Sequence, residues 1–303
     1  MKTAPRFISG IDIQSDYISI AQYSPDENAV LSVAIQPVTG TAKGLWENAG
    51  HEFKRLKQAF KFHSPDVVCS VPMEYAILKH IEAETAVADP EELIEWELSQ
   101  QIIGSIEEYS YDYQECSLKN SENCKDFLAV AYRNETIRNL TAMLKGYKLN
   151  PGIVDLDVFA LINVFEINYP EYKSVPSIII HGEADKTKII FTLEGMYLDG
   201  GCIEHSKSIE TPMQYSGIVN TEINRILSFN NAFTGQPGIG LFFTGSLLSQ
   251  QDFADAVAAI YGCGQLLSPF RKIECRVGGQ GDKMREHASK LAVAVGLALR
   301  GNE

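Results

Sequence analysis

Two similar strand–turn–strand segments constrain the fold of this chain more than any other feature of its sequence. The first covers residues 7–23 and reads FISGIDI-QSD-YISIAQY, and the second begins near residue 176 and reads SIIIHGEADKTKIIFTLEGMYLDGG. Each has an apolar strand, a short polar turn and a second apolar strand, which is the pattern of a β-hairpin. Two hairpins of one kind, about 170 residues apart, predict a duplicated α/β fold.

Alternating strands and helices are predicted around these hairpins. Ile11 and Ile13, like Ile18 and Ile20, alternate as in half-buried strands. Further strands are predicted over 29–38, 66–72, 76–83, 109–116, 126–133 and 238–244, and helices over 44–60, 90–103, 134–147, 153–167, 221–233, 252–262 and 285–301. Asp89 and Asn134 are the predicted N-caps of two of these helices. Small residues around Gly296 predict close packing of the last one.

The composition excludes several classes of protein. Of the 303 residues, 45% are hydrophobic and 21% charged, as in a chain with packed cores. A net charge of −13 argues against a basic nucleic-acid surface or a surface held to anionic lipid. The sequence contains no run of about 18 apolar residues, so no membrane-spanning helix is predicted. The N-terminus has no signal-peptide pattern. The six cysteines form no C-x-x-C pair, so we expect buried thiols such as Cys69, no zinc or disulfide framework, and a reducing, cytoplasmic compartment.

Tandem hairpins that each open an α/β half are the plan of the actin-like ATPase superfamily, and the order of further stretches is more specific. These stretches are GIDIQSDYISIAQY, VP followed by LKHIEAE, PEELIEWELSQQI-x-x-SIEEYSYDYQ, LAVAYRNETIRNLTAMLKGYKLNPGIVDLDVFAL, TEINRILSFNNAF and HASKLAVAVGLALRG. Over nearly the whole chain, the sequence resembles the PilM family of type IV pilus assembly proteins, relatives of the division protein FtsA.

The resemblance implies an organisation and a function. It implies an actin-like fold whose first lobe is 1–75 with 149–175, whose second lobe is 176–303, and whose inserted β-α-β-β-α subdomain is 76–148. It also implies a cytoplasmic scaffold at the inner face of the inner membrane. This scaffold would bind the N-terminal tail of a PilN-like membrane protein and other pilus assembly components, without nucleic acid and without inserting into the membrane.

The sequence departs from the family at the turns that hold phosphate. Gln14 stands where the family has glycine, and a side chain there obstructs the approach of backbone N–H groups to phosphate. Ser19 replaces a lysine, and Asp16 adds a negative charge beside the turn. Family members also have about 60 more residues between the second hairpin and the TEINR helix, which predicts a truncated upper subdomain in the second lobe.

The second hairpin and the third loop also depart. His181 stands where an acidic residue would organise Mg²⁺ water, although magnesium prefers oxygen ligands. Glu183 stands in place of a phosphate-facing glycine and would repel a triphosphate. Only one glycine, Gly245, remains in the third loop. The positions that match a degenerate nucleotide site are Asp12, Gln14, Ser15, Thr187, Glu222, Arg225, Gly245 and Ser246.

These losses favour a pseudo-ATPase with no catalytic residues and no metal, in which ATP and Mg²⁺ are disfavoured by Gln14, His181 and Glu183. Two alternatives remain: a functional actin-like ATPase that drives pilus assembly, and a sugar or carboxylate kinase on the same two-lobed fold. For Glu222 and Arg225, an exposed ion pair is the alternative to a contact with adenosine.

Other chemically suggestive residues have simpler interpretations. His181, His205 and His287 have no spacing that pairs them as metal ligands, and we expect surface or core histidines. Asp155 and Asp157 resemble a paired acid site, but alternation predicts that they face solvent or cap a helix. Trp96 is expected in a core, with a place in the partner groove as the alternative.

Overall fold

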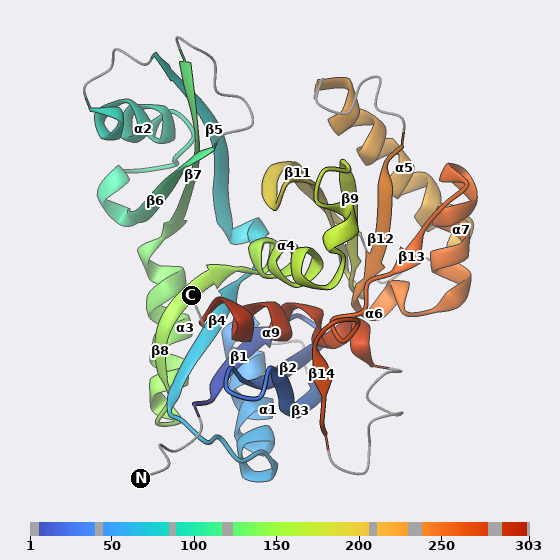
Figure 1. Ribbon diagram of the computed structural model, residues 1–303. Helices are drawn as coiled ribbons and strands as arrows, with labels where there is room; N and C mark the ends of the chain where they lie inside the picture. Colours follow the sequence, from blue (N-terminus) through green and yellow to red (C-terminus); the bar gives the residue numbers. More distant parts are fainter. Residues whose placement is uncertain are drawn as a thin grey trace. The chain divides into compact units, whose positions relative to one another are not determined.

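The computed structural model of the protein describes residues 6–39, 45–84, 89–116, 124–205, 211–229, 238–277 and 287–301. The chain divides into two compact units, and Figure 1 labels its helices and strands. Unit 1 consists of Met1–Ser70 with Leu144–Glu303, and unit 2 is Val71–Met143. The finer three-part division given above stays a prediction. Among the described residues, no helix combines the length and the apolar character needed to cross a bilayer.

Unit 1 contains two sheets, each of which belongs to one lobe. The first lobe has six strands, in the spatial order β14 (Glu274–Cys275), β3 (Ala29–Pro37), β2 (Tyr17–Ser24), β1 (Ile8–Ile13), β4 (Asp66–Val71) and β8 (Asn150–Leu156). The second lobe has five, in the order β11 (Met196–Glu204), β10 (Lys186–Leu193), β9 (Ser177–Gly182), β12 (Gly240–Thr244) and β13 (Gln265–Leu266).

The two sheets repeat one arrangement, which confirms the predicted duplication. In each lobe an antiparallel hairpin, β1–β2 or β9–β10, is extended by a third antiparallel strand, β3 or β11. A later strand, β4 or β12, then pairs in parallel with the first strand of the hairpin. The hairpin turns that follow β1 and β9 are therefore equivalent, and together with the turn after β12 they form the candidate site.

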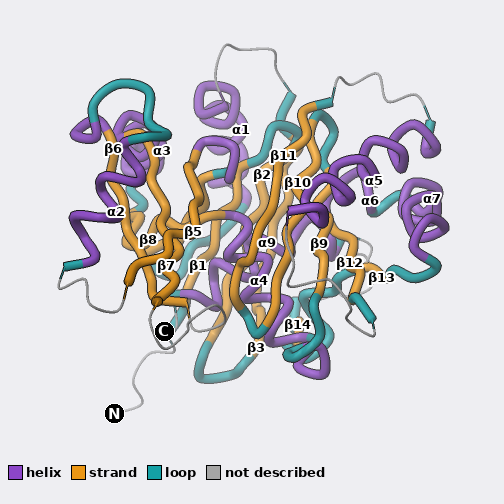
Figure 2. Tube along the Cα trace, turned by 90° about the horizontal axis from the view of Figure 1, so that it is seen from above, coloured by secondary structure: helices purple, strands orange, loops and turns teal. Residues whose placement is uncertain are grey.

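The helices of unit 1 cover the sheets. They are α1 (Leu45–Ala59), α4 (Asp157–Asn168), α5 (Pro212–Phe229), α6 (Gly245–Leu248), α7 (Gln251–Tyr261) and α9 (Ala288–Arg300), with the 3-10 turn η4 (Pro170–Tyr172). Helix α9 packs on β1, β2 and α4, and α4 and α9 lie side by side in Figure 1. Helices α5 and α7 pack against each other beside the second sheet (Figure 2).

Two glycines allow α9 to approach its neighbours closely, as the small residues around Gly296 predict. A Cβ atom on Gly296 would lie 1.9 Å from the carbonyl oxygen of Ala160 in α4. A Cβ atom on Gly10 of β1 would lie 2.0 Å from the carbonyl oxygen of Ala294 in α9. Real Cβ atoms do not come this close, so the helix can occupy its place only because both side chains are absent.

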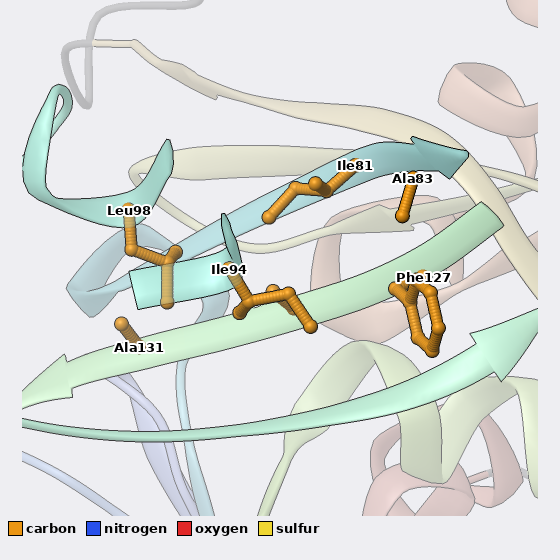
Figure 3. Close-up of a cluster of buried hydrophobic side chains, with 7 residues drawn as sticks. Ile81, Ala83, Ile94, Leu98, Phe127 and Ala131 are labelled. Carbon is orange, nitrogen blue, oxygen red and sulfur yellow. The ribbon is translucent and has the colours of Figure 1, made fainter. Parts of the chain in front are cut away.

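Unit 2 is a three-stranded antiparallel sheet with a helix on one face. Its elements are the strands β5 (Ala76–Glu84), β7 (Cys124–Arg133) and β6 (Tyr109–Cys116), the helices α2 (Pro90–Ser99) and α3 (Asn134–Gly146), and the 3-10 turns η1 (Met73–Tyr75) and η2 (Ile106–Glu108). Central strand β7 pairs with β5 and with β6. Figure 3 shows that Ile94 and Leu98 of α2 are directed onto the strands. These two side chains form the core together with strand residues such as Ile81 and Phe127.

Several predictions about elements need correction. The helix predicted over 153–167 is wrong in its first part, because β8 runs to Leu156 and α4 begins only at Asp157. Pro151 and Gly152 disfavour helix there, and strand β8 completes the edge of the first sheet. Strands β1 and β2 are buried along their whole length, not on one face only. Their polar Ser9 and Gln22 hydrogen-bond each other inside the protein.

Of the two predicted N-caps, Asp89 is confirmed and Asn134 is not. Asp89 is the N-cap of α2, and its carboxylate accepts a hydrogen bond from the backbone N–H of Glu91 at 3.0 Å. Asn134 is instead the first residue of α3, and its amide bonds Ser110 and the carbonyl of Glu107. The sequence LKNSENCK predicts a polar turn over 118–125, most of which lies outside the described residues, while Cys124 and Lys125 already belong to β7.

Candidate functional site

The turns after β1, β9 and β12 in unit 1 are joined across the two lobes. The Ser15 hydroxyl in the first hairpin turn donates to the carboxylate of Asp185 in the second, at 2.7 Å. The Ser246 hydroxyl, in α6 directly after β12, donates to the carboxylate of Asp16 at 2.6 Å. The two hairpin turns also close on themselves, since the backbone N–H of Gln14 donates to the carbonyl of Tyr17 and that of Glu183 to the carbonyl of Lys186.

A buried lysine lies at the centre of this site. The ammonium group of Lys188, on β10, is 2.5 Å from the carboxylate of Asp157 and 3.2 Å from that of Glu183. It also donates to the side-chain oxygen of Gln14 at 3.3 Å. The side chains of Lys188, Asp157 and Glu183 are fully buried. We refer to Asp12, Gln14, Asp157, His181, Glu183 and Lys188 as the Lys188 network.

Asp12 connects this network to the first sheet. One carboxylate oxygen accepts hydrogen bonds from Gln14 at 2.8 Å and from Ser70 at 2.9 Å. The other oxygen has no hydrogen-bond partner in the described part of the chain. Burial, followed by the negative charge of Asp157, raises the pKa of Asp12 from 3.8 to about 7, although Lys188 opposes the change.

Glu183 has the opposite electrostatic balance. Burial alone raises its pKa, but the positive charge of Lys188 and the hydrogen bond from His181 outweigh burial and lower the pKa to about 2. The His181 ring is 2.9 Å from this carboxylate, and both side chains are fully buried. Glu183 is therefore held as a carboxylate, while Asp12 binds its proton more tightly than an exposed aspartate does.

Glycine is retained in these loops where two backbone segments meet. Gly245 has a φ of +91°, and a Cβ atom there would lie 2.3 Å from the carbonyl oxygen of Gly182. A Cβ atom on Gly182 would lie 2.6 Å from the hydroxyl of Tyr215. Both positions therefore need glycine for contacts within the protein itself.

The predicted site residues fall into two groups. Asp12 and Gln14 belong to the Lys188 network, while Ser15 and Ser246 join the turns. Gly245 packs against Gly182 beside these residues, and the other three make separate contacts. Thr187 bonds His205 and Tyr215, each at 3.0 Å. Glu222 and Arg225 of α5 form an i,i+3 ion pair with 2.7 Å between Oε1 and Nη2.

The sequence did not predict the place of two residues of the Lys188 network, and it placed Trp96 of unit 2 wrongly. Lys188 was not singled out, and Asp157, which we expected to face solvent or cap a helix, is fully buried against Lys188. The only sequence signal for Asp157 was its pairing with Asp155. Trp96 was expected in a core but is 57% exposed on α2 of unit 2.

The comparisons with known proteins agree with this architecture. The family model for the type IV pilus assembly protein PilM matches residues 10–176. A structure of a PilM–PilN type IV pilus biogenesis complex is similar at 18% identity and a TM-score of 0.82, covering 99% of this chain and 100% of the other. Among curated proteins, none matches the sequence.

Two more distant structures share the fold. One is a Bacteroides thetaiotaomicron protein with an actin-like ATPase fold and unknown function, at 12% identity and a TM-score of 0.57, covering 97% and 96% of the two chains. The other is the cytoplasmic domain of EpsL, an inner membrane component of the type II secretion system of Vibrio cholerae, at 13% identity and a TM-score of 0.51, covering 97% and 95%. The chain has the actin-like ATPase fold.

Proposed function

The chain belongs to the family of the type IV pilus assembly protein PilM, and on this basis we propose that it is a scaffold of a pilus assembly complex that does not hydrolyse ATP. It acts at the cytoplasmic face of the inner membrane and binds the N-terminal segment of a PilN-like membrane protein. Family membership and the similarity to a PilM–PilN complex support the assembly role. The Lys188 network supports the absence of ATP chemistry.

The single observation that carries this proposal is the position of Lys188. Its ammonium group bonds Gln14, Asp157 and Glu183, which converge from both lobes on the turns that hold phosphate in nucleotide-binding relatives. A nucleotide and Mg²⁺ would need these carboxylates, and they are already matched to a cation of the protein itself. Fully buried Glu183 would also repel a triphosphate.

The contacts between the turns point the same way. Ser15 with Asp185 and Ser246 with Asp16 tie the loops together where a triphosphate would separate them. Gly182 and Gly245, which in a nucleotide site would expose backbone N–H groups, pack against each other. The residues present do not fit a magnesium–nucleotide complex, so we derive no catalytic step from one.

Isothermal titration of the full chain with Mg-ATP tests this part of the proposal. We expect no heat of binding at millimolar nucleotide and no phosphate release. Micromolar affinity with hydrolysis would contradict the proposal and favour a functional actin-like ATPase. The double variant Gln14→Gly with Glu183→Gly restores the glycines typical of the family, and circular dichroism shows whether it remains folded.

Binding of the partner is tested separately by fluorescence anisotropy with a labelled peptide from the N-terminus of a PilN-like protein. We expect saturable binding that weakens at least tenfold in Trp96→Ala, because this exposed indole offers an apolar contact on unit 2. Phe229→Ala, which removes a 78% exposed ring from α5 of unit 1, is the matched control. Absence of binding to the unaltered chain would overturn the partner assignment while leaving the result with ATP intact.

A further inference from the structure

The sheet of unit 2 gathers three metal-ligating side chains, one from each strand. They are His80 on β5, Cys116 on β6 and Asp126 on β7. Cys116 lies directly opposite Asp126 in the β6–β7 pairing, and Glu82 lies opposite Asp126 in the β5–β7 pairing. His80 precedes Glu82 by two residues and therefore shares its face of the sheet. The three residues are distant in sequence but share one face.

This face is not the one that forms the core of unit 2. The core uses the residues of the opposite face, including Ile81 and Phe127, beneath Ile94 and Leu98 of α2 (Figure 3). Residues on the second face of an antiparallel sheet commonly face water. Here Cys116 is only 5% exposed and Asp126 only 1%, while the His80 side chain is 16% exposed. The cluster is thus buried but remains accessible on the side of the imidazole.

The donor atoms are close enough to share one ion. All three lie within 4.8 Å of one another, and His80 Nδ1 is 2.7 Å from Asp126 Oδ2. In a tetrahedral zinc site the ordinary Zn–N, Zn–O and Zn–S lengths place neighbouring ligand atoms about 3.3–3.8 Å apart. Binding of zinc would need side-chain rotations that replace the His80–Asp126 hydrogen bond by two bonds to the metal.

We propose that His80, Cys116 and Asp126 form a binding site for Zn²⁺ that joins the three strands of unit 2. A nitrogen, a thiolate and a carboxylate suit a borderline-soft divalent ion and suit Mg²⁺ or Ca²⁺ poorly. Three protein ligands leave a fourth position for water. A bound zinc ion would stabilise unit 2, because a unit of about 70 residues has a small core and gains from a cross-link between its strands.

Cobalt is the spectroscopic probe for this site, because Co²⁺ adopts zinc geometry and its bond to a thiolate absorbs in the near ultraviolet. The full chain, freed of metal by a chelator, is titrated with CoCl₂. We expect a thiolate-to-cobalt band that saturates at one equivalent and disappears when ZnCl₂ is added. Cys116→Ser is expected to lose the band, whereas Cys263→Ser, which alters an exposed cysteine of unit 1, retains it. No band in the unaltered chain, or a band that depends on Cys263, overturns the proposal.

Thermal unfolding provides a second measurement that does not depend on sulfur. A ligand that binds only the folded state raises Tm in proportion to the logarithm of its concentration above Kd. We expect ZnCl₂ to raise the Tm of the unaltered chain and of Cys263→Ser, and to leave His80→Gln and Asp126→Asn unchanged. Circular dichroism without metal confirms that the variants are folded. An equal rise of Tm in His80→Gln and the unaltered chain contradicts the site.

Discussion

The burial of Lys188 cannot be predicted from the residues next to it in the sequence. It lies in the segment KTKIIF, and a lysine in a strand is expected to extend into solvent. Its burial depends on Asp157 at the start of α4 and on Glu183 in the preceding turn. These partners are 31 and five residues away. Only the folded arrangement of the two lobes brings all three charges together, so no local pattern could predict the network.

Replacement of Lys188 tests the strength of this network. Lys188→Met leaves the buried carboxylates of Asp157 and Glu183 without their cation, which typically destabilises a protein by about 3–5 kcal/mol. Urea unfolding followed by circular dichroism measures the change. Lys54→Met, at an exposed position of α1, is the matched control, with an expected change within about 0.5 kcal/mol. Equal stability of the two variants would mean that the network contributes little.

The raised pKa of Asp12 predicts a pH dependence of stability. With a pKa of about 7 in the folded state against an ordinary 3.8, Asp12 holds a proton that the unfolded chain releases. Unfolding then becomes easier as the pH rises from 4 through 7. Glu183, with its pKa lowered to about 2, acts in the opposite direction and loses its stabilising effect only as the pH falls below about 4.5.

Asp12→Asn isolates the contribution of Asp12. We expect the loss of stability between pH 5 and pH 8 to shrink by an amount on the order of 1–4 kcal/mol, because the amide cannot ionise. Urea unfolding at each pH gives the two slopes. Asp252→Asn, at an exposed position of α7, serves as the control. If the pH profile of Asp12→Asn were the same as that of the unaltered chain, Asp12 would not be the titrating group.

At the scale of whole elements, the sequence predicts the hairpins and most helices but not the boundary between β8 and α4. Gly, Pro and polar residues mark the hairpin turns locally, and Asp89 marks the start of α2. In contrast, the apolar spacing of IVDLDVFALINVFEI suits a helix throughout. Its first residues become the edge strand β8 because they pair with β4, which is a tertiary effect. The shared face of His80, Cys116 and Asp126 also depends on strand register rather than on sequence spacing.

The close approach of α4 and α9 predicts opposite effects for two glycine-to-alanine changes. In Gly296→Ala the new Cβ would meet the Ala160 carbonyl at 1.9 Å, so the two helices must separate. We expect a loss of about 1–3 kcal/mol or more. Gly217 lies on α5 with nothing within 4 Å of a Cβ, and Gly217→Ala is expected to gain about 0.5–1 kcal/mol from helix propensity. Thermal unfolding compares them, and equal effects would contradict the packing described.

At the scale of the whole molecule, contacts between turns join the duplicated lobes. An actin-like ATPase needs its lobes to move during a nucleotide cycle, whereas a scaffold does not. The contacts of Ser15 with Asp185 and of Asp16 with Ser246 therefore connect the proposed function to a mechanical property. The duplication itself is evident from the sequence, because both hairpins repeat one pattern, but these contacts between lobes are not.

A cross-link between the turns tests this property. Asp16→Cys with Ser246→Cys, in a Cys263→Ser background that removes an exposed thiol, is joined by a short bifunctional maleimide. We expect the linked protein to bind the PilN-like peptide with the affinity of the same variant before linking. Mass spectrometry verifies the link. A loss of binding of tenfold or more on linking would show that the lobes must separate, and would favour the ATPase alternative.

The cation at the centre of the site is a residue of the chain, Lys188 of β10, and not a diffusing ligand. Under the proposed function this has a consequence for the cell. A nucleotide-filled cleft reports the ratio of ATP to ADP, because occupancy follows the supply of a diffusing metabolite. Lys188 is always present at the same local concentration, so its place among the carboxylates is the same in a starved and in a well-fed bacterium. Any control of this protein by energy status must therefore enter through its partners.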